Sequence, residues 1–208
     1  MTDTPRRPGV TDAAADAAAL LGASIQLEPF RLAGGTALAW HLGHRLSEDL
    51  DFFSFPGGLE DVAASLEPLA VVGSVRSGEN TLHTRVGQCS VSFFEVEGRW
   101  LDDPMLVAEG FGVATVAEIA AMKLVAVMTR CAKKDFYDLV AIDDGGIALP
   151  HMINAARRMY DGFDAALPHL RRALAYFDEA ESDPDPLSTT GLRWNEVKRR
   201  IRRMSAGF

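Results

Sequence analysis

The sequence predicts an α/β (α+β) fold, with a small mixed sheet and flanking helices over residues 1–105 and a helical half over residues 106–208. Three observations predict this plan. Short segments that alternate apolar and polar residues fill most of the first half, whereas apolar residues at helical spacing fill the second. Between the halves, around residues 102–114, the character of the sequence changes.

In the first half, helices and strands are expected to alternate between glycine- and proline-containing turns. Gly22 and Gly43 end two of the helices, and Pro56-Gly57-Gly58 closes an aromatic-rich strand. The expected helices cover residues 11–23, 36–42 and 59–69, and the expected strands cover residues 30–33, 49–55, 71–75, 81–86 and 89–96.

In the second half, every expected element is a helix. A long helix is predicted over residues 115–143, followed by helices over residues 150–160, 164–180 and 191–204. The stretch 182–190 contains two prolines and is predicted to be a loop.

The composition is that of an ordinary globular protein and excludes several classes. A chain of 208 residues that is 48% hydrophobic can bury one core or two small ones. Its net charge of -8 excludes a generally basic coat for nucleic acid, but not a local basic patch. The two cysteines, Cys89 and Cys131, form no CxxC motif, which argues against a disulfide framework or a structural zinc site.

The sequence also shows no membrane segment. No stretch approaches the ~18 consecutive apolar residues of a transmembrane helix. The Ala-rich stretch 11–22 carries Asp12 and Asp16, so it is a poor signal-peptide core and is read as an amphipathic helix. We therefore expect a cytoplasmic protein with no membrane partner.

The first motif is a glycine pair between a strand and a helix. The strand expected at 30–33 leads into Gly34-Gly35, and the helix begins at Thr36. Glycines let a backbone approach a ligand closely, and the start of a helix offers unpaired N–H groups to a phosphate. On its own, such a pair is more often a structural turn.

The second motif, Asp49 and Asp51, lies two residues apart on a predicted strand. Period two places both carboxylates on one face. Two neighbouring carboxylates repel each other unless a cation lies between them, and hard oxygen ligands near phosphates suit Mg²⁺.

The third motif lies in the segment 123–138. On one continuous helix, Lys123, Arg130, Lys134 and Asp138 would share a face about 80° wide, at about 100° per residue. Lys123 and Arg130 would then both reach a phosphate. The alternative is a solvated charged face with Asp–Lys pairs.

Together, these motifs resemble the nucleotidyltransferase superfamily. The segment LAGGTALAWHLGHRLSEDLDFF, residues 32–53, has its Gly-Gly and Asp-x-Asp pattern, and His44-Arg45-Leu46-Ser47 resembles the AbiEii/AbiGii toxin-type branch of type IV toxin–antitoxin systems. Residues 123–139 resemble its lysine-to-arginine helix motif and the Asp-x-x-Asp motif at Asp135 and Asp138, although Met128 stands where a small hydroxyl residue is expected.

The resemblance implies a nucleotidyltransferase-like sheet and transfer of a nucleoside monophosphate from an NTP to an acceptor hydroxyl, with pyrophosphate leaving. Asp49 and Asp51 would hold two Mg²⁺ ions. The residues that would bind the nucleotide are Gly34, Gly35, Thr36, Arg45, Ser47, Lys123 and Arg130. Lys123 and Asp138 would join the catalytic carboxylates, and the helical half would close the nucleotide cleft. Arg45 and Ser47 have an equally plain alternative, a loop salt bridge and a turn hydroxyl.

The superfamily usually adds a third carboxylate on a neighbouring strand, where this chain has Ser92. Glu95 has the opposite strand parity and would face the other way unless a bulge intervenes. Either Glu95 substitutes, or another group serves as base, or the site binds nucleotide without efficient transfer.

For the biological role, the resemblance implies the toxin of a toxin–antitoxin pair, with tRNA or protein as acceptor and a separately encoded antitoxin as partner. The C-terminal basic run 198–203 is compatible with an RNA contact, although a solvated helix end that favours the helix macrodipole is the more common explanation of such a run. Two alternatives stay open: a non-catalytic nucleotide- or RNA-binding module on a degenerate fold, and an antibiotic-modifying nucleotidyltransferase.

Overall fold

The computed structural model describes residues 8–55, 57–69, 72–73 and 75–208. The chain divides into two compact units. Unit 1 comprises Met1–Gly98 and Asp102–Thr115, and unit 2 comprises Arg99–Leu101 and Val116–Phe208. The boundary suggested by the sequence, between residues 105 and 106, falls inside unit 1, because β6 (Met105–Leu106) spans it, β7 (Gly112–Val113) follows it, and both strands join the sheet.

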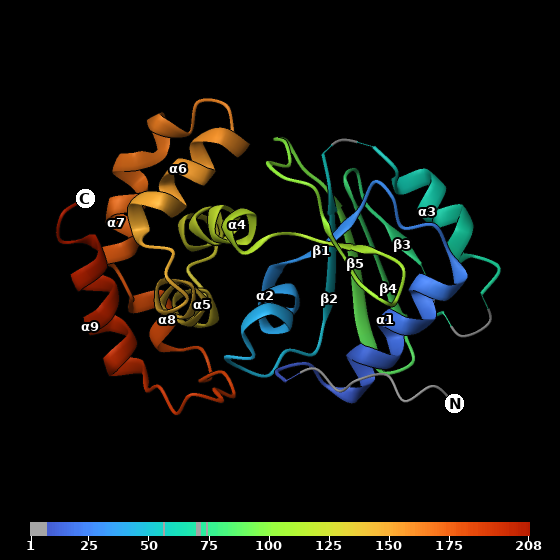
Figure 1. Ribbon diagram of the computed structural model, residues 1–208, viewed down its shortest axis with the longest axis horizontal. Coiled ribbons are helices and arrows are strands. Elements are labelled where there is room, and N and C mark those ends of the chain that lie inside the picture. The colour runs from blue at the N-terminus through green and yellow to red at the C-terminus, as the bar shows by residue number, and fades with distance from the viewer. Residues whose placement is uncertain (1–7, 56, 70–71, 74) are drawn as a thin grey trace. The chain divides into compact units, whose positions relative to one another are not determined.

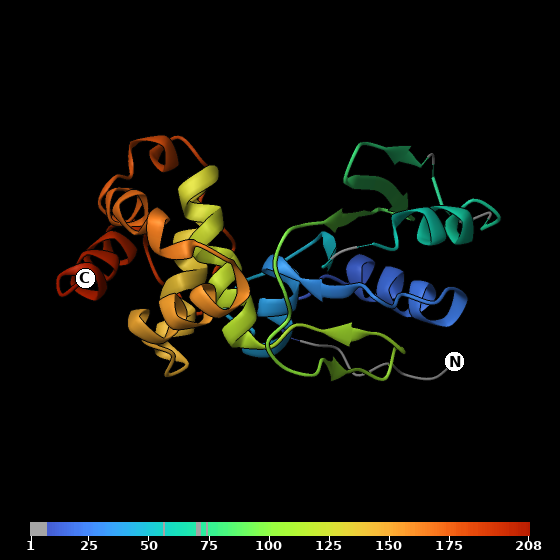
Figure 2. The ribbon, with the colours of Figure 1, turned by 90° about the horizontal axis from the view of Figure 1, so that it is seen from above.

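Unit 1 contains a mixed sheet that has seven strands within the described residues, in the order β3-β4-β5-β2-β1-β7-β6. Seen from above, β3 and β4 lie toward one edge, and β6 and β7 form the other (Figure 2). β2 runs parallel to β5 and antiparallel to β1, and β1 runs parallel to β7. The predicted mixed α/β fold is confirmed. The strands are β1 Arg31–Ala33, β2 Leu50–Ser54, β3 Arg76–Ser77, β4 Thr81–Val86, β5 Cys89–Glu95, β6 Met105–Leu106 and β7 Gly112–Val113.

Alternation along β2 and β5 separates a core face from an open face. Leu50 and Phe52 on β2, like Val91 and Phe93 on β5, are fully buried. The ring of Phe93 stacks on Phe52 at 5.1 Å and meets Phe30 edge-on at 5.3 Å. Helices α1 (Asp12–Ser24) and α3 (Leu59–Leu66) lie on one side of the sheet (Figure 1) and contact β4 or β5.

Helix α1 packs closely because its buried positions are small. Ala14, Ala17, Ala18 and Leu21 are buried at helical spacing, and Thr11 Oγ1 caps the helix by accepting from the Ala14 amide at 3.3 Å. A Cβ atom on Gly22 would lie 1.7 Å from the carbonyl oxygen of Glu109. The end of α1 therefore requires a glycine at position 22.

Unit 2 is helical throughout its described secondary structure. Helix α4 (Val116–Thr129) packs against α5 (Lys133–Asp144), α6 (Leu149–Met159) and α7 (Leu167–Ala175). Helix α9 (Trp194–Ser205) packs on α5 and α7. Two short elements complete the unit, the 3₁₀ helix Phe163–Ala166 and α8 (Asp178–Glu181).

Two predicted helices are wrong because each is interrupted. The helix expected over 115–143 is two helices, separated at Cys131, whose φ of 48° lies in the left-handed region. The helix expected over 164–180 is broken into three elements, because Pro168 fits only the first turn of a helix and a new helix starts there.

The remaining differences concern short strands. The strands β6 and β7 have two residues each and were not predicted, since two residues show no alternation. Of the strand expected at 71–75, residues 71 and 74 lie outside the described residues. Val72 forms an isolated bridge to Val86, and the ladder next to β4 is β3. In the described part of the chain, no helix combines the length and apolarity needed to cross a membrane.

The two faces of β5 give a stability prediction. Phe93→Ala removes a fully buried ring between Phe30 and Phe52, so we expect the free energy of unfolding to fall by about 3–5 kcal/mol. Phe94→Ala, its neighbour on the open face, is the control and should cost about 1–2 kcal/mol. Urea unfolding measures both, and equal costs would contradict the assignment of the faces.

Candidate active site

The glycine pair opens helix α2 (Gly34–Leu42) beside a carboxylate. Gly34 has a φ of 67°, and the preceding Ala33 makes no side-chain cap to the first amides of the helix. The register pairs Ala33 with Asp51, and a Cβ atom on Gly34 would lie 3.3 Å from Asp51 Oδ2. The start of the helix and the Asp51 carboxylate therefore share one small region at the end of β1.

Asp49 and Asp51 lie at the beginning of β2. Asp49 is exposed just before the strand, and Asp51 is half-buried on its open face. Burial raises the pKa of the nearby Cys89 thiol to about 11, and the negative charges of Asp49 and Asp51 contribute to this shift. The two carboxylates thus concentrate negative potential at this end of the sheet, which a bound cation would offset.

The loop between α2 and β2 is tied to the first turn of α2. Thr36 Oγ1 lies 2.8 Å from Ser47 Oγ and donates a hydrogen bond to the backbone carbonyl of Asp49. The Ser47 amide in turn donates to the carbonyl of Gly9 at 2.8 Å. Thr36 and Ser47 therefore hold the Asp49 backbone against the helix, a positioning role that sequence reasoning did not assign.

Arg45 lies over the glycine pair. Its side chain is buried, Nη1 donates to the carbonyl of Leu46 at 3.2 Å, and a Cβ atom on Gly35 would lie 2.2 Å from Nη2. The absence of a side chain at position 35 is what lets the guanidinium group approach the start of α2. The structure thus brings Gly34, Gly35, Thr36, Arg45, Ser47, Asp49 and Asp51 together in unit 1.

Ser92 lies directly opposite Asp51 in the parallel ladder of β2 and β5. No bulge interrupts this ladder, so Glu95 pairs with Ser54 instead. Glu95 Oε1 accepts from the amide of Leu59 at 3.0 Å, at the start of α3. Glu95 therefore does not place a carboxylate next to Asp51. Its side chain instead accepts a hydrogen bond at the start of α3.

The residue that sequence reasoning missed is His83. It pairs with Ser92 across β4 and β5, and its Nδ1 lies 3.1 Å from Ser92 Oγ. A detectable signal was the alternation of the strand 81–86, which places His83 on the open face. The pairing of that strand with Ser92 was not predicted.

In unit 2, the third motif forms a buried ionic network. Lys123 Nζ on α4 lies 2.8 Å from Asp135 Oδ1 and 2.5 Å from Asp138 Oδ2 on α5. The Lys123 side chain is 3% exposed, and both carboxylates are fully buried. Helix α5 can pack against α4 in this way because α4 ends at Thr129 and a new helix begins only at Lys133.

Arg130 completes the network from the break between the helices. Its Nε and Nη2 donate to the two oxygens of Asp135 at 2.7 and 2.8 Å, and its side chain is 52% exposed. Burial raises the pKa of Asp135, but the charges of Lys123 and Arg130 outweigh burial and hold this pKa below its ordinary value. The single helical face expected for these residues is therefore wrong, although Lys123, Arg130 and Asp138 do gather in the network.

The two lysines that open α5 differ in environment. Lys134 is exposed and lies outside the network. Lys133 is buried, and its Nζ lies 3.0 Å from Asp185 Oδ1 and 5.4 Å from the centre of the Trp194 ring. Lys133 thus anchors the loop that precedes α9.

A cavity of about 530 Å³ lies beside α3 and the β3–β4 turn. Carboxylates that line it include Glu60, Asp61, Glu79 and Glu95. Its lining includes neither Gly34 nor Asp49 nor Asp51. It is not the site formed by the glycine pair.

Comparison with known proteins supports the class of protein that this fold and site define. A candidate nucleotidyltransferase from H. pylori superposes with a TM-score of 0.58 at 17% identity, covering 94% of each chain. JHP933 from Helicobacter pylori superposes with a TM-score of 0.54 at 18% identity, covering 91% of this chain and 86% of the other. These likenesses show a nucleotidyltransferase-type fold.

The sequence comparisons define the family. The description "Nucleotidyl transferase AbiEii toxin, Type IV TA system" matches residues 18–206. An uncharacterized protein of Aquifex aeolicus (strain VF5), aq_aa25, is 33% identical over 159 residues, which cover 74% of this chain and 76% of the relative. The chain belongs to the AbiEii nucleotidyltransferase toxin family, and the predicted resemblance is confirmed.

Gly34 provides a test of the site that separates strain from function. Gly34→Ala places a side chain in the left-handed region and 3.3 Å from Asp51 Oδ2. We expect a loss of about 1–2 kcal/mol in stability and a loss of nucleotidyl transfer. Gly87→Ala is the matched control, since Gly87 has a φ of 59° and a Cβ atom there meets nothing within 4 Å. Equal transfer by the two variants would contradict the placement of Gly34 at the site.

The ionic network gives a pH-dependent stability prediction. Lys123→Met leaves buried carboxylates without their ammonium partner and should cost about 3–5 kcal/mol at pH 7. Because the folded pKa of Asp135 is lowered, its stabilising contribution is complete above its ordinary pKa of 3.8 and is lost as the pH falls below that value. The cost of Lys123→Met should therefore shrink below about pH 4.

Denaturant unfolding between pH 3 and pH 7 measures this difference. The exposed neighbour provides the control: Lys134→Met should change stability by less than about 0.5 kcal/mol. A cost for Lys123→Met that does not depend on pH would argue against the network.

Proposed function

We propose that this chain transfers a nucleoside monophosphate from an NTP to an acceptor hydroxyl on RNA, with tRNA as the first candidate, and that pyrophosphate leaves. The observation that carries the proposal is the uncapped start of α2 at Gly34, adjacent to the Asp51 carboxylate. One site then contains both backbone amides that can bind phosphate and carboxylates that can bind a cation.

The donor set in unit 1 fits Mg²⁺ bound together with a nucleotide. The described residues contain no group of three or more His, Cys, Asp or Glu side chains that could hold a metal ion. Mg²⁺ commonly takes only one or two protein carboxylates and completes its shell with water and substrate phosphates. Asp49 and Asp51 would hold the metal, which would supply positive charge at the phosphates and lower the pKa of the attacking hydroxyl.

The other residues of unit 1 bind and orient. In our proposal, the amides of Gly34, Gly35 and Thr36 bind the β- and γ-phosphates, and Arg45 adds positive charge beside them. The hydroxyls of Thr36 and Ser47 fix the backbone of Asp49, as their hydrogen bonds indicate. Roles for Lys123, Arg130 and Asp138 toward the nucleotide, and closure of the cleft by the helical half, stay predictions.

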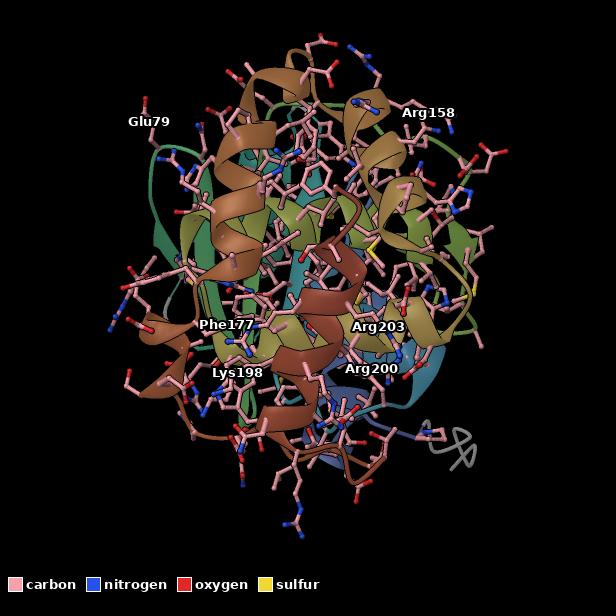
Figure 3. All side chains as sticks on the ribbon, turned by 90° about the vertical axis from the view of Figure 1, so that its left-hand side faces the viewer. Glu79, Arg158, Phe177, Lys198, Arg200 and Arg203 are labelled. Carbon is pink, nitrogen blue, oxygen red and sulfur yellow. The ribbon has the colours of Figure 1, made fainter. Side chains whose placement is uncertain are left out.

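The choice of RNA as acceptor is supported by basic residues on α7 and α9, two helices that pack together. Within the C-terminal run, Lys198 pairs with Glu181, and Arg200 pairs with Asp144. Arg203 is exposed on α9 and lies on the same side of the helix as Arg200 (Figure 3). The remaining exposed arginines of these helices are Arg171, Arg172, Arg199 and Arg202.

In this proposal the protein acts in the cytoplasm, where NTPs and tRNA are available, and a separately encoded antitoxin restrains it. Family membership supports a toxin role with such a partner. A basic contact to RNA should weaken as the salt concentration rises.

The direct test supplies each α-labelled NTP with Mg²⁺ and total tRNA to the wild-type protein and to the Asp49→Asn/Asp51→Asn variant. We expect one NTP to label tRNA, and the double variant to lose this transfer while retaining its fold by circular dichroism. Chelation of the metal should likewise abolish labelling.

Three outcomes separate the alternatives. The same assay is also offered an aminoglycoside or a protein extract in place of tRNA: label on the aminoglycoside but not on RNA would indicate an antibiotic-modifying enzyme, and label on a protein would identify a protein acceptor. Metal-dependent NTP binding without transfer to any of these acceptors would contradict the proposed reaction and favour a binding module.

A further inference from the structure

The strand register aligns four side-chain positions across the open face of the sheet. Asp51 on β2 pairs with Ser92 on β5, Ser92 pairs with His83 on β4, and His83 pairs with Arg76 on β3. Neighbouring strands lie about 4.8 Å apart. The Ser92 hydroxyl is therefore on the strand adjacent to Asp51, and His83 is one strand farther.

The His83 side chain lies against Ser92, the residue opposite Asp51. Its Nδ1 lies 3.1 Å from Ser92 Oγ, and its ring meets Phe94 edge-on at 5.6 Å between centroids. Phe94 is in turn stacked on Phe53 at 4.9 Å, so the imidazole rests against a two-ring support on the open face. A hydroxyl and an imidazole are thus held in hydrogen-bond contact beside a carboxylate that the proposed reaction requires.

Nucleotidyl transfer requires a base for the proton of the acceptor hydroxyl, and Ser92 and His83 can supply one. As the acceptor oxygen bonds to the α-phosphorus, its proton must move to a base. Glu95 is directed to α3, and the position opposite Asp51 holds a hydroxyl rather than a carboxylate. Among the described side chains of this cross-strand row, His83 carries an imidazole, a side chain that can serve as a general base.

We propose that Ser92 and His83 act as the proton acceptor for the attacking hydroxyl, an inference that rests on the proposed function. The new bond forms between the acceptor oxygen and the α-phosphorus, and the bond from the α-phosphorus to the pyrophosphate oxygen breaks. The acceptor proton passes to Ser92 Oγ while the Ser92 proton passes to His83 Nδ1. His83 is exposed, so the resulting imidazolium releases a proton to water and restores the starting state.

The charged groups that face His83 define the conditions of the test. Arg76 is its cross-strand neighbour on β3, Arg85 follows two residues along β4 on the same face, and Asp51 lies beyond Ser92. Because salt screens these charges, pH profiles must be compared at constant ionic strength.

The experiment compares His83→Gln with wild type in the transfer assay, across pH 5 to 9. Glutamine keeps a hydrogen-bonding group for Ser92 but cannot take up the proton. For the wild type we expect kcat to rise with pH, because only the neutral imidazole can accept a proton. His83→Gln should lower kcat by about 10²-fold or more and abolish this rise, with little change in KM for the NTP.

Two further variants distinguish proton transfer from a structural role. Imidazole added to His83→Ala should restore part of the rate, and Ser92→Ala should lower kcat without changing NTP binding. His151→Gln, at an exposed histidine of α6, is the matched control and should behave as wild type.

The outcomes separate this inference from the proposed function. Transfer by His83→Gln at the wild-type rate, with an unchanged pH profile, would overturn the role of His83 and leave the proposed reaction standing. A wild-type protein that transfers no nucleotide under any condition would overturn both.

Discussion

The pairing of β1 with β2 is the constraint on which the candidate site depends. It sets Ala33 opposite Asp51, so the chain leaving β1 must turn into α2 directly beside that carboxylate. A left-handed residue at position 34 makes this turn, and a glycine there keeps a side chain away from Asp51 Oδ2. One antiparallel register thereby fixes the helix start and the Asp51 carboxylate relative to each other before any ligand binds.

The local parts of this arrangement could be predicted from sequence because their signals are local. The glycine pair, the period-two spacing of Asp49 and Asp51, and the strand 81–86 each depend on a few neighbouring residues. The opposite parity of Glu95 and Ser92 follows from the same period, and the structure shows Glu95 directed to α3. The contact of His83 with Ser92 depends on which strands pair and in which register, which no local pattern specifies.

The third motif shows a different limit. A helical wheel over residues 123–138 assumes an unbroken helix, but Cys131 adopts a left-handed conformation that nothing in its residue type predicts. The break lets α5 return against α4, so that Asp135 and Asp138 approach Lys123 from a second helix. Of the residues expected to share a face, Lys123, Arg130 and Asp138 gather in a largely buried ionic network, and Lys134 stays outside it. Sequence reasoning identified the set and missed the geometry because one backbone torsion decides it.

Burial also explains why the carboxylates of the two units behave differently. Asp135 and Asp138 are removed from water, so they require the Lys123 ammonium in the folded state itself. Asp49 and Asp51 remain exposed or half-buried at the end of a sheet, where water can solvate them, and their negative potential extends to Cys89. Carboxylates removed from water contribute to the fold through their ion pairs, whereas carboxylates that water reaches stay accessible to a cation that arrives with a substrate. This difference in solvation supports the proposal that the metal binds in unit 1.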